Sequence, residues 1–129
     1  MHLTIAENIA VRALAHPDRI AIEVLDGGAT LTYGQAWCRI TALAEALAVA
    51  KAGRHGVMVA LLLPNEADAT LAYLACQMAG VAAVPISTRL AEPEIRFVVE
   101  DADAKLILTG GPFAEIADKL DITVVRVED

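Results

Sequence analysis

Apolar residues recur at helical spacing in some stretches of the chain and form short continuous runs in others. Residues 33–51 place Ile40 and Leu47, among other apolar side chains, on one stripe, which predicts a helix buried along one side. Residues 57–63 form an unbroken apolar run, which predicts a strand covered on both faces. The whole pattern predicts helices over 4–15, 33–51, 66–79, 93–101 and 113–119, and strands over 20–25, 29–31, 57–63, 81–86, 105–108 and 122–127.

Local signals mark where several of these elements begin. Thr32, with a glutamine three residues later, forms a capping box for the second helix. Asp26-Gly27 between two short apolar runs predicts a β-hairpin, because glycine adopts a positive φ without penalty. Asn65 is expected to cap the helix over 66–79.

The order of the elements predicts the fold class. Helices and apolar strands that alternate after the hairpin indicate an α/β fold, with a mainly parallel sheet flanked by helices and a short N-terminal β-hairpin. We expect residues 1–129 to be a single domain, because this length suits one hydrophobic core. A complete domain of this kind more often continues from its last strand into another helix, so we expect the sequence to be part of a larger one.

Composition and charge exclude several classes of function. The chain is 57% hydrophobic and its formal net charge is -7, so a general positive field for nucleic acid or anionic lipid is not expected. No apolar run approaches the ~20 residues of a membrane span, and the first residues lack the basic segment of a secretory signal. Two cysteines and three scattered histidines predict neither a disulfide framework nor a metal cluster. These features favour a cytoplasmic location.

Arg89 is the best single candidate for a ligand-binding residue. It follows Ser87 and Thr88 at the end of a predicted strand, and open α/β sheets bind ligands at the carboxyl ends of their strands. A surface salt bridge is the alternative explanation of the same arginine. The residues themselves indicate no catalytic group and no metal site.

The loop over residues 109–112 offers a second possible binding site. Its sequence Thr-Gly-Gly-Pro follows a predicted strand, where backbone amides can cradle a phosphate. A plain turn is the alternative, because Pro112 removes one amide donor and no phosphate-binding motif is present. A small flavodoxin-like nucleotide binder using this loop is therefore one hypothesis for the chain.

The other chemically active side chains have simpler explanations. His16 and His55 stand in turns without a carboxylate to orient them, so we expect solvated histidines. Cys38 and Cys76 fall inside predicted helices and are expected to be small buried hydrophobic residues. The acidic residues within 100–103 lie at a helix end and are expected to be a solvated charge run.

Four strings, in order and with their spacing kept, resemble motifs of the adenylate-forming enzymes. Residues 31–35 (LTYGQ) resemble the family's L-T-Y-x-[EQ]-L opening, and residues 57–65 (VMVALLLPN) resemble D-R-V-A-I-x-L-P-N. Residues 72–86 resemble A-Y-L-A-x-x-x-A-G-A-V-x-V-P-L-N, and residues 89–105 resemble R-L-x-x-x-E-L-x-x-I-L-x-D-S-x-A-K. The resemblance covers nearly the whole chain. Two departures are Arg54-His55-Gly56, where the family has Gly-Asp, and Ser87, where it has Asn.

The resemblance implies the N-terminal portion of an AMP-forming acyl-CoA synthetase. The fold would then be an incomplete N-terminal part of the family's large domain. ATP, Mg²⁺ and coenzyme A are implied for the complete enzyme, which joins a carboxylate to AMP and passes the acyl group to coenzyme A. The family's phosphate loop, adenine contacts and C-terminal lysine lie beyond the motifs found here, so no catalytic or cofactor-binding residue is carried over.

Two functions from different classes follow. The first is a scaffold piece of an acyl-CoA ligase, inactive alone, with the remainder of the enzyme chain as its partner. The second is a non-catalytic interaction module that keeps this half-fold. Such a module would pair with a separate catalytic chain or form a homo-oligomer through an exposed apolar face.

Overall fold

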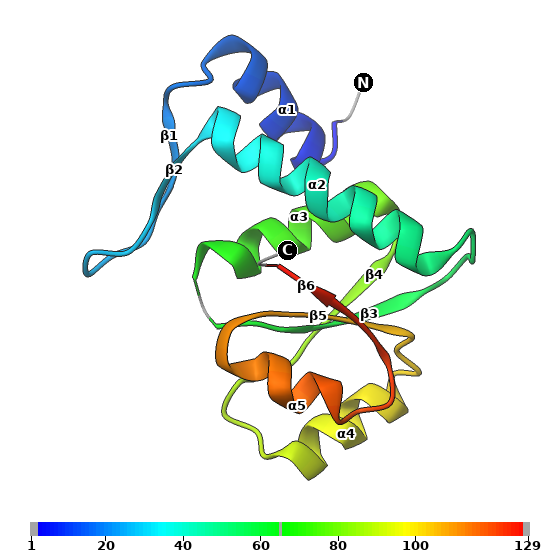
Figure 1. The fold of residues 1–129 in the computed structure, drawn as a ribbon. Coiled ribbons are helices and arrows are strands. Elements are labelled where there is room, and N and C mark those ends of the chain that lie inside the picture. The colour runs from blue at the N-terminus through cyan, green and yellow to red at the C-terminus, as the bar shows by residue number, and fades with distance from the viewer. Residues whose placement is uncertain (1–2, 65, 128–129) are drawn as a thin grey trace.

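A parallel sheet lies between two layers of helices (Figure 1). The computed structural model describes residues 3–64 and 66–127. From the N-terminus the elements are α1 (Ile5–Ala15), β1 (Ile20–Glu23), β2 (Thr30–Thr32), α2 (Tyr33–Lys51), β3 (Met58–Leu62), α3 (Ala67–Ala79), β4 (Ala82–Pro85), α4 (Glu92–Asp101), β5 (Leu106–Thr109), the 3-10 turn η1 (Gly111–Phe113), α5 (Ala114–Asp118) and β6 (Thr123–Arg126).

The sheet has the strand order β4-β3-β5-β6, and all its neighbouring strands are parallel. The α/β class and the mainly parallel sheet predicted from the sequence are confirmed. Strand β5 is buried along its whole length, and β3 is buried except at Met58. The prediction of a buried strand over 81–86 is wrong in one respect. Strand β4 is only partly buried, because it lies at an edge of the sheet and has a neighbour on one side alone.

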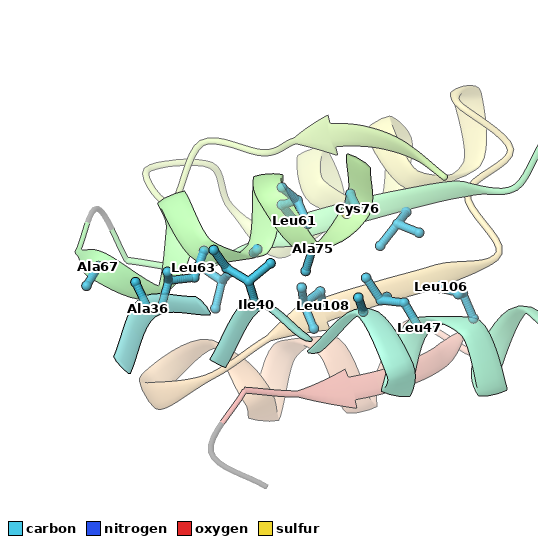
Figure 2. Packing of buried hydrophobic residues seen from close by; sticks show 14 of the residues in the cluster. Ala36, Ile40, Leu47, Leu61, Leu63, Ala67, Ala75, Cys76, Leu106 and Leu108 are labelled. Atoms are coloured by element: carbon cyan, nitrogen blue, oxygen red, sulfur yellow. The ribbon is translucent and has the colours of Figure 1, made fainter. Parts of the chain in front are cut away.

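The helices α2 and α3 cover one face of the sheet (Figure 2). Ile40 and Leu47 of α2 pack with Leu71 of α3, and all three side chains have no exposed surface. At the ends of the two helices, Lys51 Nζ donates a hydrogen bond to the carbonyl of Ala79 at 2.7 Å. The apolar stripe predicted for α2 therefore faces α3 and the sheet.

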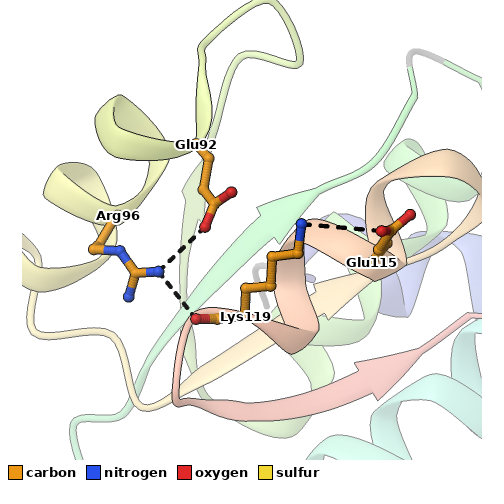
Figure 3. Close-up of polar contacts among 4 residues, drawn as sticks. All are labelled: Glu92, Arg96, Glu115 and Lys119. Atoms are coloured by element: carbon orange, nitrogen blue, oxygen red, sulfur yellow. Dashed lines mark hydrogen bonds and ion pairs between the residues drawn. The ribbon is translucent and has the colours of Figure 1, made fainter.

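The other face is covered by α4 and α5, and a polar group joins these two helices (Figure 3). Arg96 Nη2 donates to Glu92 Oε1 at 3.3 Å and to the carbonyl of Lys119 at 3.0 Å. Lys119 Nζ lies 3.9 Å from Glu115 Oε1. Partly or fully exposed pairs of this kind contribute little to stability, so we interpret this group as a structural link between the helices rather than a binding site.

The N-terminal hairpin forms a separate antiparallel sheet of β1 and β2, as predicted. Figure 1 shows it projecting from the body as an arm beside α2. Asp26 and Gly27 have φ values of 60° and 81°, the left-handed conformations that a tight hairpin turn requires. The Val24 N–H donates to the carbonyl of Ala29 at 2.9 Å and closes the loop.

The capping box predicted for the start of α2 is present, whereas the N-cap of α3 is one residue later than predicted. Thr32 accepts a hydrogen bond from the Gln35 N–H at 3.2 Å, and the Gln35 side chain accepts from the Thr32 N–H at 2.9 Å. The residue at the N-cap of α3 is Glu66, and Asn65, the predicted cap, lies outside the described residues. Among the helices that the structure describes, none is both long and apolar enough to cross a bilayer.

Candidate functional site

The carboxyl ends of the parallel strands lie along one edge of the sheet, and a hollow of about 430 Å³ lies beside β3 and β4 there. Its floor is apolar and includes the buried Leu61, Leu63 and Ile86. Arg89 lines this hollow and is exposed, and its backbone N–H donates to Ser87 Oγ at 3.3 Å. Within the described ranges its guanidinium forms no ion pair. Ligand binding by Arg89 therefore stays a prediction. The alternative, a surface salt bridge, finds no carboxylate partner for Arg89 within the described part of the chain.

A buried hydroxyl joins the two central strands at the same edge. Thr109 has no exposed surface, and its Oγ1 donates to the carbonyl of Leu62 at 2.9 Å. The helix that follows β3, α3, packs in one layer, and the helix that follows β5, α5, packs in the other. The strand order reverses between β3 and β5, and open α/β sheets form their binding crevice at such a reversal. The Thr109 bond ties β5 to β3 at this position.

The loop after β5 is tighter than an open phosphate cradle. Gly110 is buried, and the 3-10 turn η1 begins at Gly111, whose φ is 58°. The helix that follows, α5, is only 5 residues long, so it brings few oriented amides to the loop. Phosphate binding by residues 109–112 stays a prediction, and the plain turn describes the observed backbone.

His16, His55 and the acidic run lie apart from this edge. His16 is the exposed C-cap of α1, and its N–H donates to the carbonyl of Arg12 at 2.7 Å. His55 is exposed in the loop between α2 and β3. Asp103, at the end of the acidic run, pairs with Lys105 Nζ at 2.7 Å. In the described parts of the chain, no group of three His, Cys, Asp or Glu side chains could hold a metal ion.

The two cysteines differ in environment. Cys76 is 1% exposed in the α2–α3 layer, as predicted, and burial raises the pKa of its thiol to about 11. The prediction of a buried Cys38 is wrong, because that residue lies on the exposed side of α2. A thiol reacts as its thiolate, so both burial and the raised pKa make Cys76 unreactive.

Thiol labelling of the folded chain is expected to modify one cysteine. At neutral pH a disulfide reagent should modify Cys38 rapidly and Cys76 only at the rate of unfolding. In denaturant both thiols should react. Mass mapping of the labelled peptides assigns each thiol, and a Cys38→Ser variant that labels rapidly without denaturant would contradict the burial of Cys76.

Thr109 is the residue at this edge that sequence reasoning did not single out as buried. The apolar run Leu-Ile-Leu before it predicted a strand, and the loop hypothesis treated the threonine as part of a turn. Its hydrogen-bond partner, Leu62, belongs to a strand far away in the chain. The signal available in the sequence was that the apolar run of this strand continues directly into a hydroxyl residue.

Parallel strands between two helix layers, with a reversal at their carboxyl edge, define the doubly wound α/β class. The chain belongs to the AMP-binding enzyme family, whose sequence profile matches residues 9–128. This match confirms the resemblance to the adenylate-forming enzymes.

Curated relatives include several CoA ligases. The chain is 39% identical over 75 residues to a long-chain-fatty-acid–CoA ligase of Mycobacterium tuberculosis, covering 58% of this chain and 14% of that protein. It is 36% identical over 102 residues to the 2-succinylbenzoate–CoA ligase of Bacillus subtilis, covering 79% of this chain and 20% of that protein. For the oxalate–CoA ligase of Arabidopsis thaliana the identity is 35% over 124 residues, which cover 92% of this chain and 23% of that protein. The chain thus spans less than a quarter of these relatives.

Solved structures of adenylate-forming enzymes share the fold. The O-succinylbenzoate coenzyme A synthetase of Bacillus subtilis, in complex with AMP, matches with a TM-score of 0.76 and 31% identity over 93% of this chain and 31% of that one. The N-terminal domain of a Mycobacterium tuberculosis protein named FACL13, bound to an inhibitor, matches with a TM-score of 0.77 and 31% identity over 91% of this chain and 29% of that one. These matches confirm the predicted likeness to the N-terminal part of such enzymes.

Proposed function

We propose that this chain is the N-terminal scaffold part of an acyl-CoA ligase. The complete enzyme would activate a carboxylic acid with ATP to an acyl-adenylate and transfer the acyl group to coenzyme A. The observation that carries the proposal is the family match over residues 9–128, supported by relatives that are CoA ligases. The scaffold role is supported by the buried strands β3 and β5, which hold two layers of helices in place. In this proposal residues 1–129 form one structural unit.

ATP, Mg²⁺ and coenzyme A would be the cofactors and substrates of the complete enzyme. A Bacillus subtilis relative has been solved with ATP and magnesium, which supports the first two. The loop after β5 does not suit a triphosphate. This loop carries no cation, Pro112 has no N–H, and the nearby Arg126 is paired with Asp118 at 2.6 Å. We therefore assign no step of the reaction to these residues.

The test is the reading frame beyond Asp129 in the source DNA, followed by an ATP–pyrophosphate exchange assay. We expect the frame to continue through a Ser/Thr/Gly-rich loop, and the encoded full chain to catalyse exchange that depends on a carboxylic acid. The 129-residue chain alone should show no exchange above background. Exchange by the short chain would overturn the scaffold role, and a full chain without exchange would overturn the ligase assignment.

The alternative is an interaction module without catalysis, and the exposed apolar side chains favour it. Leu14 on α1 and Leu25 in the hairpin loop are 88% and 80% exposed. Exposed apolar groups drive association when they form a contiguous patch. A stop codon after Asp129, together with concentration-dependent sedimentation of the short chain, would favour this alternative. A monodisperse monomer would count against it.

A further inference from the structure

A further hollow lies at the amino ends of the parallel strands, at the opposite edge of the sheet from the hollow beside Arg89. Its volume is about 600 Å³, a size that suits a small organic molecule. The loop between α2 and β3 meets the turn between α4 and β5 there. The Lys105 N–H donates to the carbonyl of Met58 at 3.0 Å and joins these two segments. The proposed function does not use this corner of the fold.

The loop before β3 carries positive groups where the family resemblance leads one to expect a negative one. Arg54-His55-Gly56 stands at the position where the adenylate-forming enzymes have Gly-Asp. The loop therefore brings a guanidinium and an imidazole in place of a carboxylate. This reversal occurs in a chain whose formal net charge is -7, and it belongs to this sequence rather than to the family's motif.

Arg54 is held in place by the end of helix α2. Its Nε donates to the carbonyl of Lys51 at 2.9 Å, and its Nη2 donates to the carbonyl of Ala50 at 3.2 Å. These bonds offset the negative end of the helix dipole and fix the planar guanidinium at the same time. Within residues 3–64 and 66–127 the guanidinium forms no ion pair. An anion that binds Arg54 therefore meets a charged group that is already ordered.

Lys105 supplies the second positive charge of the hollow, and its present partner holds it weakly. Lys105 Nζ lies 2.7 Å from Asp103 Oδ1, and the two side chains are 50% and 81% exposed. A pair this exposed contributes little to stability, so a competing carboxylate can replace Asp103. His55 lines the same hollow, is exposed, and offers a ring N–H as a further donor.

The floor of the hollow is apolar. It includes the buried Val57 and the side chain of Met58, which is 38% exposed. A bare inorganic anion gains nothing from such a floor, whereas a hydrocarbon group is stabilised when it covers apolar surface. The combination of cations at the rim with an apolar floor therefore selects an anion that has a hydrocarbon body.

We propose that this hollow binds a small carboxylic acid with a hydrocarbon body. The carboxylate lies between Arg54 and Lys105, and the hydrocarbon covers Val57 and Met58. Guanidinium and ammonium groups pair with carboxylates through charge-assisted hydrogen bonds, which are stronger than bonds between neutral groups. The site is argued from residues of this chain alone, so it goes beyond the proposed function and does not depend on it.

A titration of the isotope-labelled chain with octanoate, followed by the amide chemical shifts in NMR spectra, tests this site. Octanoate should shift the amides of residues 54–58 and 102–105 in a saturable way, with a dissociation constant in the millimolar range or below. Acetate has the charge without the body, octanol has the body without the charge, and inorganic phosphate is an anion without a hydrocarbon group. Each of these three should bind at least about tenfold more weakly than octanoate.

Three single substitutions sharpen the test. Lys105→Gln removes a cation from the hollow and should weaken octanoate binding about three- to fivefold. Asp103→Asn removes the competing carboxylate and should tighten binding by a similar factor, and asparagine tolerates the φ of 53° at this position. Lys119→Gln is the matched control, because this lysine is 53% exposed beside a carboxylate but lies outside the hollow. It should leave octanoate binding unchanged. A dispersed amide spectrum shows that each variant folds.

Several outcomes would overturn the site. One is the absence of a saturable shift with octanoate. Equal affinity for octanol would reveal an apolar patch without carboxylate recognition, and equal affinity for phosphate would reveal general attraction of anions. A Lys105→Gln variant with unchanged affinity, or an Asp103→Asn variant with weaker affinity, would also contradict the proposal. None of these readouts involves pyrophosphate exchange, so a failure of the ligase assignment is distinguishable from a failure of this site.

Discussion

Replacing Leu108 with alanine is expected to lower the free energy of unfolding by about 3 kcal/mol. Leu108 lies in β5, has no exposed surface and packs in the α2–α3 layer (Figure 2). Its neighbours on β3 and β6 hold the backbone in place, so the structure cannot collapse into the cavity. Since small domains have stabilities of about 5–15 kcal/mol, this loss would be a large share of the total.

Urea denaturation followed by circular dichroism measures this loss. Val49→Ala removes the same kind of apolar surface from a position that is 80% exposed, so its effect should stay below about 0.5 kcal/mol. Equal losses for Leu108→Ala and Val49→Ala would show that β5 does not lie at the centre of the core.

Raising the pH above 9 is expected to destabilise the chain through Cys76. Burial raises the pKa of this thiol from 9.0 to about 11 in the folded state. Between these values the unfolded chain loses the proton while the folded chain keeps it. The stabilising contribution is therefore fully present below the unfolded pKa and is lost as the pH rises through the folded one, with a size of about 2–3 kcal/mol.

The measurement compares urea midpoints below pH 9 and at pH 11 for the parent chain and for Cys76→Ala. The alanine variant should be less stable at the lower pH because it leaves a small cavity. Its further loss at high pH should be smaller, since it has no thiol to ionise. Cys38→Ala, altered at the exposed cysteine, should follow the parent. Identical pH dependence in the parent and in Cys76→Ala would contradict the role of burial.

Hydrophobic patterning predicted the elements well but could not predict their position in the sheet. Residues 57–63 and 81–86 are both short apolar runs, yet β3 is central and β4 is an edge. A local run reports how apolar a strand is, whereas strand order depends on which pairs form across the chain. Edge position therefore had to come from the structure.

Side-chain environment was predicted only where the local pattern decides it. Cys38 and Cys76 both stand in predicted helices, but only Cys76 faces the core, because the orientation of each residue on its helix decides burial. The bond from Thr109 to Leu62 joins distant segments and has no local signature. Arg89 was a candidate from its place after a strand, and the structure adds the hollow beside it.

The central place of β3 has a consequence for how the chain folds during synthesis. Of the parallel strands that the structure describes, β3 is the first to leave the ribosome, and β4 joins it on one side. Its other side waits for β5, which arrives only after α4 has been made. Before α4 has been made, Ala60 and Leu62 have no helix layer over them, because that layer is built from α4 and α5. The nascent chain thus carries an uncovered apolar surface until α4 and α5 have been made, and its sheet closes by insertion of β5 on the far side of β3 rather than by sequential addition at one edge.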